Sequence, residues 1–143
     1  PGEDELFDTV RGLSFLKPFT DDEVHEFVDA GEWLRFRLGQ EIVAEDDERE
    51  SLFLMLSGRA CSSRGGAGLD ESDEGESFGE ISYITGEAQV YAVNATKPSM
   101  VLRIDEPVVD WASFTCQLKL HKQLQRVLAE RLSVMSRRVT EAR

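Results

Sequence analysis

The stretch that decides the fold reads Gly75-Glu76-Ser77-Phe78-Gly79-Glu80 and lies near the middle of a chain of 143 residues. Glycines at both ends of a short Glu-Ser-Phe segment predict backbone turns that residues with a Cβ atom tolerate poorly. A short apolar segment follows the stretch. Strand-like sequence lies on both sides, and a long helical pattern comes after it. We therefore expect residues 75–93 to be the segment around which the rest of the chain is organised.

Composition indicates one globular domain over residues 1–143. Hydrophobic residues make up 41% of the chain and charged residues 31%, which is ordinary for a globular protein. No apolar run approaches the ~20 residues of a membrane span. A net charge of −12 argues against binding nucleic acid or inserting into an anionic membrane. Two cysteines, Cys61 and Cys116, fit reduced thiols in a cytoplasmic protein. Because the chain begins at Pro1 rather than Met, we expect a neighbouring domain of unknown kind in a longer protein.

Residues 1–31 have the pattern of two helices. Apolar residues recur over 3–16 at three- and four-residue spacing, which is one face of a helix. Pro18 breaks this pattern, and Thr20 followed by Glu23 three residues later forms a capping box. The second helix is expected to end near Gly31.

From residue 32 to residue 104 the pattern changes to that of strands. Strand-like segments at 33–38, 42–44, 51–58, 59–64, 69–75, 90–95 and 100–104 are separated by turn residues. Segment 51–58 is apolar enough to be buried on both faces. The run Gly65–Gly68 predicts a tight turn. Short strands spaced in this way indicate an antiparallel sandwich or roll.

Residues 105–143 are predicted to form two helices, a short one after Pro107 and a long one from Phe114 to Val139. Two apolar stripes run along the long helix. The inner stripe is expected to pack on the β structure and cover the stretch at 75–93. The outer stripe supplies a candidate dimer seam at Leu118, Leu128, Leu132 and Met135. A single wide stripe on a monomer explains the same spacing, so both alternatives stay open.

Three motifs in this order resemble the cyclic nucleotide-binding domain family, in its catabolite-activator-like effector form. They are Gly39-Gln40-Glu41-Ile42, the strand Leu52 to Gly58, and the Gly-Glu-x-Phe-Gly-Glu turn at Gly75 to Glu80. The resemblance implies a mainly β, α+β fold: an antiparallel β-roll (jelly-roll) of about eight strands. N-terminal helices would occupy 1–31, the roll 32–104 with a phosphate-binding cassette at 75–93, and C-terminal helices 105–143. It also implies a regulatory, non-enzymatic domain that needs no cofactor. No metal is expected, because His25 and His121 lie on separate predicted helices without a Cys or carboxylate partner at ligand spacing.

By this resemblance, cyclic AMP or cyclic GMP is the expected ligand. The candidate ligand-binding residues are Phe78, Gly79, Glu80, Ile81, Ser82, Gln89 and Val90. Gly79 and Glu80 would contact the ribose, and the amides of Ile81 and Ser82 the phosphate. The family's phosphate-binding Arg falls on Gln89, which can donate a hydrogen bond but cannot neutralise an anion. Three further residues, Tyr83, Ile84 and Tyr91, are expected in the core.

The charge around the cassette opposes an anionic ligand. Between Gly65 and Thr96 there is no Lys or Arg, against seven acidic residues. A cation could come from the C-terminal helix, at Lys119, Lys122 or Arg126. Glu80 has a plain alternative role, in which it caps the cassette helix or pairs with a basic residue.

Three hypotheses follow for the function. The first is a cyclic nucleotide sensor that relays cassette occupancy through its C-terminal helix to a partner domain. The second is a degenerate dimerisation or interaction module that binds no nucleotide. The third is the effector domain of a transcription regulator whose DNA-binding part lies outside this sequence.

Overall fold

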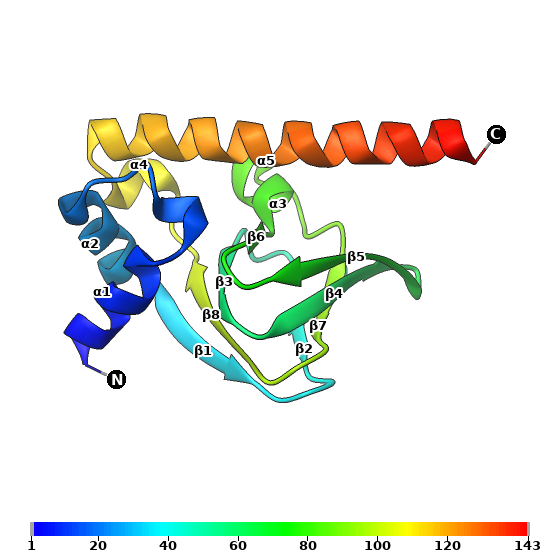
Figure 1. Cartoon of the computed structure of the whole chain (residues 1–143), viewed down its shortest axis with the longest axis horizontal. Coiled ribbons are helices and arrows are strands. Elements are labelled where there is room, and N and C mark those ends of the chain that lie inside the picture. Colours follow the sequence, from blue (N-terminus) through cyan, green and yellow to red (C-terminus); the bar gives the residue numbers. More distant parts are fainter. Residues whose placement is uncertain (1, 143) are drawn as a thin grey trace.

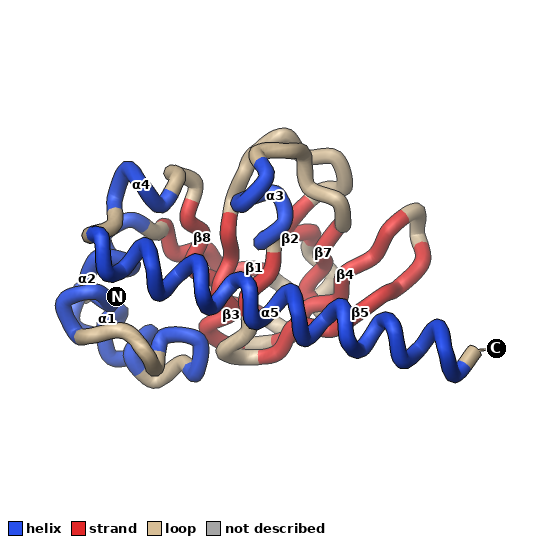
Figure 2. Tube along the Cα trace, turned by 90° about the horizontal axis from the view of Figure 1, so that it is seen from above, coloured by secondary structure: helices blue, strands red, loops and turns tan. Residues whose placement is uncertain are grey.

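The computed structural model of the chain describes residues 2–142 and has three parts. An N-terminal helical group packs at one end of a β-roll, and one long helix crosses over both (Figure 1). A quarter turn of the view shows the long helix lying along the whole molecule, with its C-terminal end beyond the roll (Figure 2). Among the described residues no helix has the length and apolar character needed to cross a membrane.

The N-terminal group contains α1 (Glu3–Arg11), a 3₁₀ turn η1 (Ser14–Leu16) and α2 (Asp21–Ala30). The predicted helix over 3–16 is therefore wrong in extent, because α1 ends at Arg11 and Leu13 is extended (φ −76°, ψ 137°). The capping box is confirmed: the Thr20 hydroxyl accepts from the Glu23 amide, and the Glu23 carboxylate accepts from the Thr20 amide.

The roll consists of two four-stranded antiparallel sheets, which confirms the fold class. One sheet has the order β1 (Glu32–Phe36), β8 (Ser99–Ile104), β3 (Leu52–Ser57) and β6 (Ser77–Phe78). The other has the order β2 (Glu41–Val43), β7 (Ala92–Ala95), β4 (Arg59–Arg64) and β5 (Ala67–Asp73). Connections between the sheets bring the segment after β6 to the open end of the roll, below the long helix (Figure 1).

Most strand boundaries differ from the prediction by one or two residues, and one strand was not predicted. β5 begins at Ala67 rather than Leu69, because the turn needs only Gly65 and Gly66, both at positive φ. β7 begins at Ala92 rather than Val90. The two-residue strand β6 has no counterpart in the prediction, since its two ladder positions, at Ser77 and Phe78, lie inside the turn motif.

Strand β3 separates two halves of the core, which confirms that it is buried on both faces. Leu52, Leu54 and Leu56 face the N-terminal helices and the long helix. Phe53 and Met55 face the interior of the roll. Alternation with period two places these side chains on opposite faces of one strand.

Two C-terminal helices follow the roll, α4 (Val108–Trp111) and α5 (Phe114–Glu141). The first half of α5 is docked on the core by Cys116, Leu120 and Leu124, its buried residues. Polar contacts reinforce this half: Lys119 forms an ion pair with buried Glu23 of α2, and Gln123 donates to the Phe15 carbonyl at 2.7 Å. Beyond Leu124, no described residue of α5 is buried.

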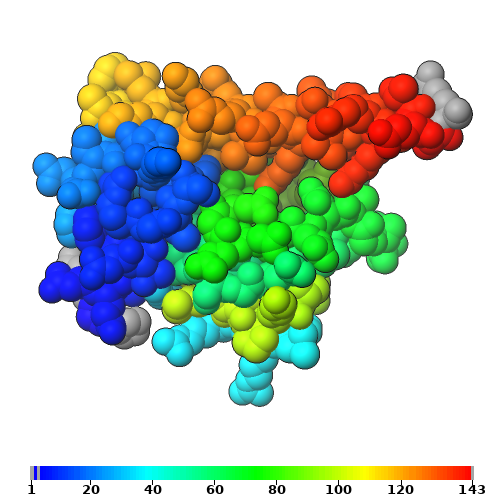
Figure 3. All heavy atoms as spheres, viewed as in Figure 1, coloured from blue at the N-terminus to red at the C-terminus, as the bar shows by residue number. Residues whose placement is uncertain are grey.

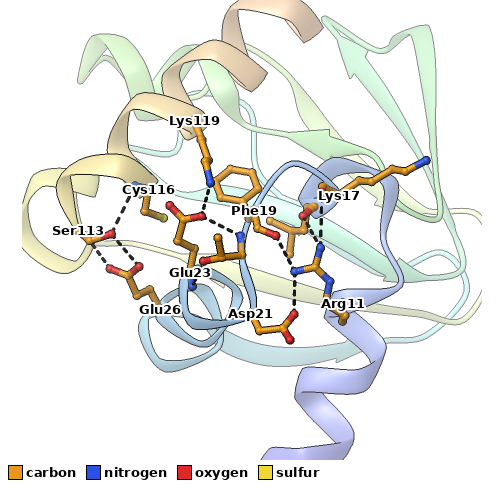
Figure 4. Close-up of polar contacts among 11 residues, drawn as sticks. Arg11, Lys17, Phe19, Asp21, Glu23, Glu26, Ser113, Cys116 and Lys119 are labelled. Carbon is orange, nitrogen blue, oxygen red and sulfur yellow. Dashed lines mark hydrogen bonds and ion pairs between the residues drawn. The ribbon is translucent and has the colours of Figure 1, made fainter.

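The contact between α2 and the start of α5 is drawn in Figure 4. Glu26 accepts from the Ser113 amide and hydroxyl at the α5 N-cap. Burial alone raises the pKa of Glu23, but hydrogen bonds from Lys119, Thr20 and Thr115 outweigh it and lower that pKa to about 2. The N-terminal helices thus fix the first half of α5 electrostatically as well as by packing.

Candidate functional site

The turn motif positions a short helix at the open end of the roll. β6 ends at Phe78, whose ring stacks on Phe53 at 4.8 Å between centroids. Gly79 then adopts a left-handed conformation (φ 81°) and starts α3 (Glu80–Thr85). A Cβ atom on Gly79 would collide with the Ser51 carbonyl oxygen, so the turn needs glycine for space as well as for φ.

A cavity of about 760 Å³ lies between this turn and α5. Its floor comes from the 75–81 segment and residues 89–91, one side from β5, and its cover from the inward face of α5 after Gln123. In the space-filling view the C-terminal part of α5, in orange and red, lies over the green segment that contains β5 and the turn (Figure 3). The inner stripe therefore covers the cassette as predicted, through Val127 and Val134.

Glu80 holds the two sides of the cavity together. Its carboxylate is buried, with 2% of the side chain exposed, and Arg131 of α5 lies 2.6 Å and 2.8 Å from its two oxygens. Arg131 also donates to the Ser77 carbonyl at 2.6 Å, and the Ser77 hydroxyl donates to Glu80 at 3.0 Å. The alternative prediction for Glu80, pairing with a basic residue, describes this contact. The cation, Arg131, is not among those predicted from the sequence.

Gln89 is buried beside the turn and has a structural contact. Its amide nitrogen donates to the carbonyls of Arg49 and Ser51, at 3.2 Å and 3.1 Å. It therefore fixes the segment that enters β3. The neutral side chain also lines the cavity, at 5% exposure, and adds no charge to it.

Six of the seven candidate ligand-binding residues line the cavity: Phe78, Gly79, Glu80, Ile81, Gln89 and Val90. The seventh, Ser82, does not; its buried hydroxyl donates to the Glu87 carbonyl at 2.6 Å. Tyr91 lines the cavity and Ile84 is 47% exposed, so the prediction that both belong to the core is wrong. Tyr83 does pack against the core, and its hydroxyl joins α3 to α4 by donating to the Glu106 carbonyl and accepting from Trp111.

Of the proposed helix cations, only Arg126 reaches the cavity, because Lys119 is paired with Glu23 and Lys122 is not in the lining. Arg131 and Arg138 also line it. These three arginines face five acidic residues, Asp70, Glu71, Glu76, Glu80 and Glu130. Charges of both signs thus meet in one cavity, the cations on α5 and most of the carboxylates on the roll. Within residues 2–142 no group of three side chains suits a metal ion.

The sequence of residues 33–112, which contains the roll and the turn motif, matches the family described as cyclic nucleotide-binding domain. The chain belongs to this family. Among curated relatives, the cGMP-dependent protein kinase egl-4 of Caenorhabditis elegans is 25% identical over 123 residues. That match covers 86% of this chain and 16% of the kinase. The chain therefore spans about one sixth of the length of this relative.

Solved structures share the cyclic nucleotide-binding fold. The regulatory domain of Toxoplasma gondii PKA with cAMP has a TM-score of 0.72 and 17% identity, and the match covers 92% of this chain and 49% of that one. The regulatory subunit of a cAMP-independent protein kinase A from Trypanosoma cruzi, bound to guanosine, has a TM-score of 0.64 and 20% identity. That match covers 76% of this chain and 43% of the other. These likenesses establish the fold of the domain.

Proposed function

We propose that this domain is a regulatory sensor that binds a nucleotide or nucleoside between its cassette and α5. The observation that carries the proposal is the cavity of about 760 Å³, which has the cassette on one side and α5 on the other. Ligand cavities of this size enclose most of a drug-sized molecule. A bound ligand would touch both sides at once, so its presence would change how α5 sits on the roll.

The cassette offers the groups that a ribose requires. Glu80 can accept hydrogen bonds from vicinal hydroxyls, and Gly79 permits close approach of the backbone. Tyr91, Val90 and the aliphatic face of α5 provide apolar surface for a base. These features favour a ligand built from a sugar and a flat ring.

The neutral side chain of Gln89 limits the affinity of the cavity for a cyclic phosphate. Compared with an Arg at the same place, a neutral amide forgoes a charge-assisted contact of about 2–5 kcal/mol, or ~30- to several-thousand-fold in affinity. A neutral nucleoside loses nothing by this replacement. The guanosine bound to the Trypanosoma cruzi protein makes uncharged nucleosides a second ligand class to test beside cyclic nucleotides.

The relay to a partner would run through α5. Its first half is fixed by buried side chains, whereas the polar contacts of its second half with the cassette run through Arg131. A ligand that reached Glu80 would compete with this ion pair and shift the second half. A second connection, from Tyr83 to Trp111, links α3 to α4 just before α5 begins. A neighbouring domain attached after α5 would receive the movement.

A second candidate function, dimerisation, is favoured by the outer stripe of α5. Exposed fractions along this stripe are large: Phe114 74%, Leu118 56%, Leu132 67%, Met135 54% and Val139 57%, although Met135 also borders the cavity on the inward side of α5. Their spacing, with Leu128, follows a heptad pattern. A second copy of the chain that packed its α5 against this one would bury the stripe.

Calorimetric titration with cyclic AMP, cyclic GMP, cyclic dinucleotides, guanosine and adenosine tests the sensor function. Binding of one of these ligands below about 100 μM at near-physiological salt is expected. Binding of none of them below millimolar concentration would reject the sensor and leave an interaction module. The matched variant is Gln89→Arg, which should raise the affinity for a cyclic nucleotide and leave that for guanosine unchanged.

Sedimentation tests the dimer. Wild-type protein is expected to sediment as a dimer, and the double variant Leu128→Glu and Leu132→Glu as a monomer. An unchanged mass, or a wild-type monomer at high concentration, would remove the dimer seam from the proposal.

A further inference from the structure

The cassette lacks a cation on the roll side. Gln89 is neutral and its amide is already bonded to backbone carbonyls. No described residue of the roll that lines the cavity is Lys or Arg, and the lining carboxylates are mostly on that side. An anionic ligand therefore needs its cation from α5.

Arg131 is the arginine of α5 that reaches the cassette. Its guanidinium lies within 2.8 Å of both Glu80 oxygens and donates to the Ser77 carbonyl. The side chain is 34% exposed, so it borders the cavity instead of being sealed in the core. Arg126 and Arg138 line the same cavity, but within residues 2–142 the arginine that contacts Glu80 and Ser77 is Arg131. Of these three arginines, Arg131 is the one whose guanidinium contacts Glu80, the carboxylate that a ribose would approach.

The Glu80–Arg131 pair can be exchanged for a ligand without leaving either charged group without a hydrogen-bond partner. Ribose hydroxyls would replace the guanidinium as donors to Glu80, and a phosphate would replace the carboxylate as the acceptor for Arg131. A nucleoside satisfies only Glu80, and inorganic phosphate satisfies only Arg131. Because a charged group without a hydrogen-bond partner is unfavourable at a buried or partly buried site, the best-matched ligand carries both groups.

We infer that Arg131 is the phosphate-binding residue of this domain, and that it takes the role which Gln89 does not fill. The inference rests on the proposed ligand-binding function. It specifies the ligand class as a nucleotide that combines a ribose hydroxyl with an anionic phosphate. When the ligand binds, Arg131 exchanges Glu80 for the ligand phosphate. The second half of α5 is then held by the ligand and no longer by the Glu80–Arg131 ion pair.

Calorimetry with cyclic GMP, cyclic AMP and guanosine on Arg131→Gln tests this assignment. The variant is expected to lose at least ~10-fold in affinity for the cyclic nucleotide that binds wild type, because a charge-assisted contact is removed. Guanosine should bind as well as to wild type, or more tightly, since Glu80 has lost its competitor. The matched controls Arg126→Gln and Arg138→Gln should stay within about threefold of wild type. An Arg131→Gln variant that bound cyclic nucleotide as tightly as wild type would overturn the inference.

Removing Arg131 leaves Glu80 as a buried carboxylate without its cation, so the single variant could unfold. The double variant Glu80→Gln with Arg131→Gln replaces the ion pair by two amides, and Glu80→Gln alone is its reference. The ratio of cyclic nucleotide affinity to guanosine affinity should fall at least ~10-fold from the reference to the double variant. An unchanged ratio would reject the role of Arg131 while the sensor function stood. Absence of any nucleotide or nucleoside binding by wild type would reject both.

Discussion

Alanine substitution of two leucines on the same helix is expected to affect stability very differently. Leu124 of α5 is 1% exposed and belongs to the main core cluster, whereas Leu132, two turns later, is 67% exposed. Replacing Leu124 by Ala removes buried methyl groups and leaves a cavity, which costs about 2–5 kcal/mol of the free energy of unfolding. Replacing Leu132 by Ala should change that free energy by less than about 0.5 kcal/mol. Both substitutions keep a good helix former in place, so helix propensity cancels in the comparison.

Urea denaturation followed by circular dichroism measures both variants against wild type. A loss of 2–5 kcal/mol corresponds to a melting temperature lowered by roughly 4–20 °C in a domain of this size. Each variant should be measured at low and high protein concentration, because a dimer seam would make Leu132→Ala destabilising only at high concentration. A Leu124→Ala variant that lost less than about 1 kcal/mol would refute the docking of the first half of α5 on the core.

Three further predictions concern single residues. Gly79→Ala should lower the free energy of unfolding by more than ~2 kcal/mol in urea titrations. The control Gly66→Ala, also at positive φ but with open space around it, should lower it by about 1–2 kcal/mol. Equal losses would contradict the close approach of Gly79 to the Ser51 carbonyl. Because the pKa of Glu23 is lowered from 4.5 to about 2, its ionised form stabilises the native state above pH ~4.5, and about 3 kcal/mol is lost as the pH falls towards 2. Urea unfolding at several pH values should show this loss in wild type and a smaller one in Glu23→Gln, and parallel curves would count against it. Burial raises the pKa of the Cys116 thiol to about 12. A thiol reagent at pH 7.5 should therefore label only the partly exposed Cys61 in native protein, which peptide mapping by mass spectrometry measures. Similar labelling rates at the two cysteines would contradict the burial of Cys116.

The sequence was sufficient for the parts of the fold that depend on local pattern. Alternation and turn residues located seven of the strands, and Thr20 with Glu23 located the start of α2. The prediction was wrong where the apolar spacing of a helix continued past the end of that helix. Residues 3–16 keep helical spacing of apolar side chains because α1 and η1 both pack on the same core, although the chain bends between them.

The candidate site was predictable on the side of the turn motif and not on the side of α5. Spacing within the motif identified the residues that line the floor of the cavity. Which cation of α5 meets Glu80 depends on the rotation of a helix and on where it crosses the roll, and neither can be read from sequence periodicity. One available signal was that Arg131 lies four residues after Val127 and three before Val134, on the inner stripe.

Because the buried residues of α5 end at Leu124, Arg131 lies close to the fixed half of the helix and the C-terminal end lies much farther from it. Arg131 lies seven residues beyond Leu124, which is about 10 Å along the helix axis at 1.5 Å per residue. Glu141 lies seventeen residues beyond Leu124, which is about 25 Å. If the second half turned as a rigid rod about Leu124, a displacement of Arg131 by about 1 Å would move the end of the helix by roughly 2.4 Å. Under the proposed relay, a small change of partner at the cassette would reach the end of α5 enlarged, with no change in the fold of the roll.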